Sequence, residues 1–163
     1  MIISKALGVF AATLLTSAAS AAASDSTYVK MAGAGDQYEI QSSKLVLTST
    51  KNPAVKRLAN MMIQDHMKSS SMVKAAAAKA GMHPKPAMLD PDGKDMLRRL
   101  RLAKGQDRDS LYIEQQKMAH TKALSLHQEE SAAGATRSLK IVAGKIVPVV
   151  QHHKSMIEGM RTR

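Results

Sequence analysis

The chain has 163 residues and a formal net charge of +11, a length that allows one domain or one domain with an appendage. It contains no cysteine, which excludes a disulfide framework, a thiolate metal site and a cysteine nucleophile. Aromatic residues make up only 2%, too few for a typical β-sandwich or barrel core, whereas the abundant Ala, Leu, Val and Met favour helices.

Residues 1–23 have the organisation of a secretory signal peptide. Lys5 precedes an apolar stretch over residues 6–15, and small residues follow as far as Ala23. The apolar run is shorter than the roughly 20 residues that a membrane anchor needs. We therefore expect cleavage after Ala23 and a single mature domain over residues 24–163, located in the periplasm or at the outer membrane. Export also argues against nucleic acid as the partner of this basic chain.

The mature chain has a helical hydrophobic period almost throughout. A first helix is expected over about residues 26–49. Asn52 followed by Pro53 is a strong start signal for a second helix, because Asn is a preferred N-cap and proline fits the first helical position. Gly81 ends that helix, and the proline-rich stretch over residues 81–91 is predicted to be a loop.

Three further helices are predicted after this loop. A short amphipathic helix covers residues 92–103, a third long helix is capped by Asp107 or Asp109 and runs to Ala133, and a fourth covers about residues 138–160. Four long helices with short turns at two of the junctions predict an all-α, up-down-up-down four-helix bundle, with the short helix inserted between the second and third.

One polar side chain on each long helix lies on the apolar face that points to the core: Glu39, His66, His120 and His153. At roughly 1.5 Å per residue, Glu39 and His66 lie about 17 and 20 Å from the turn before the second helix. His120 and His153 lie about 20 and 22 Å from the turn before the fourth helix. With both turns at one end of the bundle, the four side chains converge on one level.

Such buried groups need partners, which either a metal ion or a mutual hydrogen-bond network would supply. A set of three histidines and one glutamate suits Zn, Cu or Fe. The chain contains no Glu-x-x-His, the pair that dinuclear carboxylate sites use, which argues against ferroxidase-type chemistry. No nucleophile or acid–base set stands out beyond these residues, so we expect a non-enzymatic protein.

Several short segments resemble the DUF4142 family of exported bacterial proteins. They are Tyr38-Glu39-Ile40-Gln41-Ser42-Ser43, Asn52-Pro53-Ala54-Val55-Lys56, Met62-Ile63-Gln64-Asp65-His66, Asp109, Tyr112-Ile113, Gln116, Ala119-His120, Lys145 to Pro148, and His153. The resemblance implies a ferritin-like four-helix fold and matches Glu39, His66, His120 and His153 to positions that recur in the family. The chain departs from the pattern at Arg108 and His127, where aromatic and bulky apolar residues are usual.

A second hypothesis starts from the charge. The segment 94–104 forms a basic amphipathic helix, with apolar side chains on one side and Arg98, Arg99 and Arg101 around the other. Such a helix either covers the bundle with its basic face in solvent or binds an anionic surface. The alternative function is therefore a basic interaction protein that binds anionic envelope polymers or a lipid surface, with the core His and Glu residues forming a purely structural network.

Overall fold

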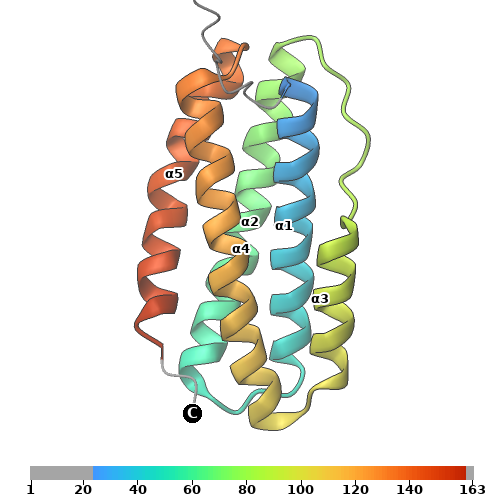
Figure 1. The fold of residues 1–163 in the computed structure, drawn as a ribbon, viewed down its shortest axis with the longest axis vertical. Coiled ribbons are helices and arrows are strands. Elements are labelled where there is room, and N and C mark those ends of the chain that lie inside the picture. The colour runs from blue at the N-terminus through green and yellow to red at the C-terminus, as the bar shows by residue number, and fades with distance from the viewer. Residues whose placement is uncertain (1–23, 161–163) are drawn as a thin grey trace, which may run out of the picture.

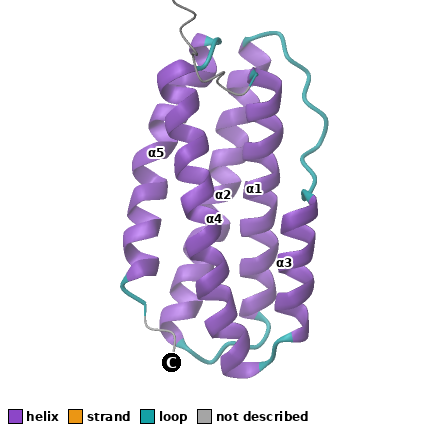
Figure 2. Ribbon diagram, in the orientation of Figure 1, coloured by secondary structure: helices purple, strands orange, loops and turns teal. Residues whose placement is uncertain are grey.

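The computed structural model describes residues 24–160, which form five α-helices and no strand (Figure 2). The predicted all-α class is therefore confirmed, and the predicted signal peptide lies outside the described residues. None of the described helices is both long and apolar enough to span a bilayer. The helices are α1 (Asp25–Leu47), α2 (Pro53–Lys79), α3 (Pro91–Leu102), α4 (Gly105–Ala133) and α5 (Arg137–Glu158).

The four long helices lie side by side, and the short α3 stands at the edge of the group (Figure 1). Around the group, α1 contacts α2, α2 contacts α5, α5 contacts α4, and α4 contacts α1. The short helix packs on α1 and α4. Each long helix thus has two long neighbours and turns one face toward a shared core.

The direction of α4 differs from the prediction. Thr50, in the turn between α1 and α2, donates a hydrogen bond to Asp109 at 2.7 Å, so α4 begins at the end of the bundle where α1 and α2 meet. Thr136 donates to Asp25, so the turn between α4 and α5 lies at the opposite end. The predicted up-down-up-down alternation is therefore wrong. The loop that follows α2, together with α3, returns the chain to the end of the bundle where α2 begins, so α2 and α4 run in the same direction (Figure 1).

Most predicted helix ends are found, with one exception. Asn52 caps α2 by accepting a hydrogen bond at 2.9 Å from the backbone N–H two residues further on. Gly81 has a φ of +70°, which only glycine adopts without cost, and ends the helix as predicted. The prediction that Asp107 or Asp109 caps α4 is wrong. The helix begins at Gly105, and Asp109 is instead buried against the turn between α1 and α2.

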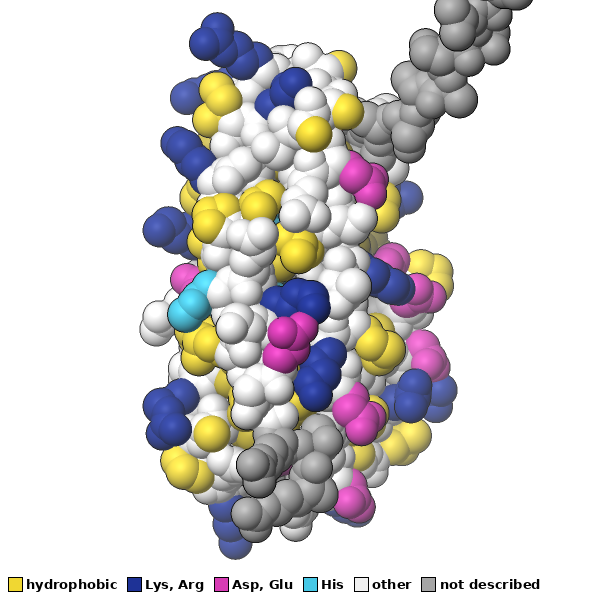
Figure 3. Space-filling model, turned by 60° about the vertical axis from the view of Figure 1, so that its left-hand side comes forward, with side chains coloured by type: hydrophobic (Ala, Val, Ile, Leu, Met, Phe, Trp, Pro, Cys, Tyr) yellow, Lys and Arg dark blue, Asp and Glu magenta, His cyan; other side chains and the backbone are white. Residues whose placement is uncertain are grey.

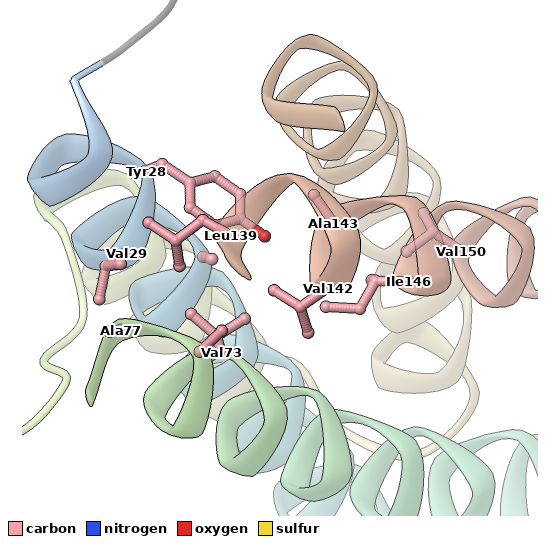
Figure 4. Close-up of a cluster of buried hydrophobic side chains, with 11 residues drawn as sticks. Tyr28, Val29, Val73, Ala77, Leu139, Val142, Ala143, Ile146 and Val150 are labelled. Atoms are coloured by element: carbon pink, nitrogen blue, oxygen red, sulfur yellow. The ribbon is translucent and has the colours of Figure 1, made fainter. Parts of the chain in front are cut away.

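The core consists of two apolar clusters with polar residues between them. The upper cluster, at the start of α1 (Figure 4), contains Tyr28, Val29, Ala32, Val73, Ala76, Ala77, Leu139, Val142, Ala143, Ile146 and Val150. The lower cluster, at the end of α1, contains Val46, Val55, Leu58, Ala59, Met62, Leu100, Tyr112, Ile113 and Ile157. The buried polar residues between them include Asp36, Glu39, Ser42, His66, Gln116, His120 and His153. Because burying polar groups is costly, this middle layer is where a function is to be sought.

Candidate metal centre

The middle layer contains all four side chains singled out from the sequence. Glu39, His66, His120 and His153 are each no more than 6% exposed. The three histidines come from α2, α4 and α5, and each offers a ring nitrogen that lies within 4.8 Å of those of the other two. Glu39 is buried beside them, but among the described residues it does not belong to the group within that distance.

The histidines converge even though the topology used to predict their convergence is wrong. The 27 residues of α2 span about 40 Å, so a residue about 20 Å from one end is near mid-height from either end. The predicted heights were all close to 20 Å. The predicted convergence of the four side chains on one level therefore does not depend on which end of the bundle carries each turn.

Two aspartates orient two of the imidazole rings. The Nδ1 atom of His66 is 2.8 Å from Asp36, and the Nε2 atom of His153 is 2.9 Å from Asp65. An ionised carboxylate only accepts hydrogen bonds, so these nitrogens carry the protons. In the neutral rings the lone pairs are then on Nε2 of His66 and Nδ1 of His153. Nε2 of His66 is buried and has no hydrogen-bond partner.

The third ring is oriented by the backbone of its own helix. Nδ1 of His120 lies 3.0 Å from the carbonyl oxygen of Gln116, which can only accept, so the proton is on Nδ1. The lone pair of His120 is therefore on Nε2, and this atom is 3.3 Å from Nδ1 of His153. Two lone pairs at that distance repel each other unless a proton or a cation lies between them.

Burial keeps two of the histidines neutral. It lowers the pKa of His120 to about 3, with the charges of the other two histidines adding to the effect. It also lowers the pKa of His153 below its usual value, against the opposing hydrogen bond to Asp65. Burial acts in the same direction on His66, but the hydrogen bond to Asp36 and the charge of Glu39 outweigh it and raise the pKa overall. Neutral imidazole is the form that binds metal ions.

Glu39 lies on the far side of His120 from the nitrogen pair. Its Oε1 atom is 3.5 Å from Nδ1 of His120, and its Oε2 atom is buried without a partner. Burial raises the pKa of this carboxyl to about 7, although the charge of His66 and a hydrogen bond with Gln116 oppose the rise. The carboxyl group therefore contacts one histidine and does not join the three-nitrogen group.

Sequence reasoning missed the two aspartates. Asp36 is one helical turn before Glu39 and thus shares its face, which is a signal that could have found it. It is 4% exposed, and Ser70 donates to its second oxygen at 2.8 Å. Asp65 directly precedes one histidine in the sequence but binds another, His153, across the interface between α2 and α5. Only the packing of these helices reveals that partner.

The fold and this centre define an all-helical protein with a buried three-histidine cluster. The family model described as "Domain of unknown function (DUF4142)" matches residues 11–160, so the chain belongs to this family. The crystal structure of a DUF305 protein from Streptomyces coelicolor, described as secreted, has a similar fold with a TM-score of 0.68. That similarity covers 82% of this chain and 90% of the other at 14% sequence identity. No curated protein matches the chain significantly.

Proposed function

We propose that this chain is an exported protein that binds one transition-metal ion through His66, His120 and His153. The observation that carries the proposal is the meeting of three ring nitrogens from three helices within 4.8 Å. Three imidazoles suit Zn, Cu or Fe. The proposal concerns binding and assigns no reaction to the protein.

The spacing of the nitrogens supports a metal ion. Metal–nitrogen bonds of about 2.0–2.1 Å in a tetrahedral centre separate two ligand atoms by about 3.3 Å. This is the distance between Nε2 of His120 and Nδ1 of His153. A cation between them would replace the repulsion of two lone pairs by two bonds, and it would give the unpartnered Nε2 of His66 a partner.

The surrounding carboxylates support the same proposal. Histidine ligands of metal ions usually donate their second ring N–H to a carboxylate or a carbonyl, and all three rings here do so. Asp36 and Asp65 would also balance the charge of a divalent ion held by neutral imidazoles. In this proposal Glu39, which the sequence indicated as a fourth ligand, acts through its contact with His120.

We infer a ferritin-like architecture and export as the setting of the site. The hairpins α1–α2 and α4–α5 are joined by one long crossover that contains α3, and one such crossover is typical of ferritin-like bundles. The description of the DUF305 protein as secreted agrees with the signal-peptide pattern in residues 1–23. In this proposal the site lies in the periplasm or at the outer membrane.

Metal analysis tests the proposal directly. Protein purified without chelator or His-tag should carry one metal ion per chain, and its melting temperature should rise when Zn or Cu is added to the metal-free form. His120→Ala should abolish both effects. His152→Ala is the matched control, because this histidine adjoins His153 but is exposed. Absence of bound metal, together with an unchanged melting temperature, would refute the proposal.

A second candidate function is binding to an anionic envelope polymer or lipid surface. Arg98, Arg99 and Arg101 of α3 are exposed, which favours it. However, Leu97 and Leu100 are buried, so the apolar face of α3 is already used in packing. In Figure 3 the Lys and Arg side chains are scattered over the displayed face with acidic groups among them. Retention on anionic vesicles that disappears with salt would support this candidate, and indifference at low salt would remove it.

A further inference from the structure

A cavity of about 130 Å³ adjoins the histidine cluster. His66 and His153 line it from the cluster, Ser69 and His127 add polar groups, and Ala32 and Ala123 leave space with their small side chains. A water molecule takes up roughly 30 Å³ in the liquid, so the cavity has room for a few waters or for a molecule of similar size. The cavity therefore borders the proposed ligands His66 and His153.

Two buried polar side chains at this cavity have atoms without a hydrogen-bond partner. Nε2 of His66 is one, and Oγ of Ser69 is the other. The two residues are 6% and 8% exposed. Buried polar groups in proteins are nearly always paired. The proposed metal ion gives Nε2 of His66 its partner, so Oγ of Ser69 is the atom that indicates a further polar occupant of the cavity.

The cavity reaches the surface beside α1. Gly35 lines it and is exposed, and a Cβ atom added there would meet nothing within 4 Å. Met31 on the same helix is 50% exposed, and Lys122 on α4 is also exposed. A glycine inside a helix weakens it by about 1 kcal/mol relative to alanine, and here it leaves the opening clear.

His127 supplies a hydrogen-bond donor to the lining. Its Nδ1 is 3.0 Å from the hydroxyl of Tyr28, whose pKa burial raises far above its usual value, so the hydroxyl keeps its proton and can donate it to this nitrogen. Burial lowers the pKa of His127 to about 4, so the ring is neutral, and with Tyr28 as the donor to Nδ1 its proton is on Nε2. The lining thus contains two donors, Nε2–H of His127 and the hydroxyl of Ser69.

We propose that the cavity binds a small anion of a few atoms, such as hydroxide or azide, on an open coordination position of the metal, with Ser69 and His127 as hydrogen-bond donors. The inference rests on the proposed metal site. Three protein ligands leave the fourth position of a tetrahedral ion to water or to an added ligand. A small anion bound to the metal accepts both hydrogen bonds. The carboxylates that also line the cavity, Asp36, Asp65 and Asp90, already accept hydrogen bonds from His66, His153 and the backbone N–H of Gly93, and Lys122 at the opening pairs with Asp92 at 2.9 Å.

Azide titration of the Cu²⁺-loaded protein tests this inference. We expect a saturable new absorption band while the metal content stays constant. Ser69→Ala should weaken azide binding about threefold to tenfold, the effect of one lost hydrogen bond, at unchanged metal content.

Substitutions that fill the cavity test the route to the metal. Gly35→Leu and Ala123→Leu should abolish the azide response or weaken it at least tenfold, with copper still bound. Met118→Leu is the matched control, because this residue is on α4 as well but is exposed and outside the lining. Two results would overturn the inference. One is bound copper whose absorption does not change with azide, and the other is an azide response in both filled variants equal to that of the wild type. Absence of bound copper would overturn this inference, and absence of any bound Zn, Cu or Fe would overturn the proposed function with it.

Discussion

The substitution Glu39→Gln in the metal-free protein tests how the raised pKa of this buried carboxyl group affects stability. Burial raises the pKa of Glu39 to about 7 from the ordinary 4.5. A group whose pKa is higher in the folded state than in the unfolded state stabilises the fold. The full stabilisation is present at pH values below the pKa of the unfolded state, and it is lost as the pH rises through the pKa of the folded state. Glutamine has nearly the same shape and does not ionise, so the variant lacks this dependence.

The magnitude follows from the size of the pKa change. Each unit corresponds to about 1.4 kcal/mol, so a rise from 4.5 to about 7 corresponds to roughly 3 kcal/mol. Between about pH 4 and about pH 8, the free energy of unfolding of the variant should therefore increase by roughly 3 kcal/mol relative to the wild type. Because Glu39 is only 3% exposed, solvent screening reduces this figure little.

The assay is urea unfolding of both proteins across this pH range in the presence of a chelator. Taking the difference between the two curves removes the contributions of titrating groups that do not interact with Glu39; His66, whose pKa the charge of Glu39 raises, stays coupled to it and contributes to the difference. Glu114→Gln is the control, because it removes a carboxylate that is exposed on α4. A difference between Glu39→Gln and the wild type that stays constant from acid to alkaline pH would refute the reasoning.

Three further predictions address the metal site, the core and the backbone. Asp36→Asn should lower metal affinity about tenfold to a hundredfold, measured by competition with a chelator, because Asp36 orients His66; unchanged affinity would contradict that role. Leu58→Ala should cost about 2–5 kcal/mol in urea unfolding, since Leu58 is 1% exposed in the lower cluster; a loss below 1 kcal/mol would contradict tight packing there. Gly81→Ala should destabilise the protein by about 1 kcal/mol because its φ is +70°, and a neutral effect in thermal unfolding would argue against that conformation.

The local features of the fold were predictable because they depend on neighbouring residues. The start of α2 at Asn52 and its end at Gly81 follow from the shapes and hydrogen bonds of single residues. The direction of α4 was not predictable, because it depends on contacts such as Thr50 with Asp109, which are 59 residues apart in the sequence. Helical periodicity carries no information about such a contact.

The site was predictable to a similar degree. Periodicity identified the three histidines as inward-facing, since their faces are those of the apolar residues around them. Periodicity could not tell which nitrogen of His120 the carboxyl of Glu39 approaches. It places Glu39 on the inward face of α1 but does not fix where the side chain ends within the core. It also could not pair Asp65 with His153, since that pairing depends on the register between α2 and α5.

Anomalous scattering from a crystal soaked in Zn²⁺ or Cu²⁺ tests the central claim most directly. The account predicts one strong peak between His66, His120 and His153, about 2.0–2.1 Å from one nitrogen of each ring. A structure in which the metal is found only on surface residues, with the three rings unchanged and no peak between them, would contradict it.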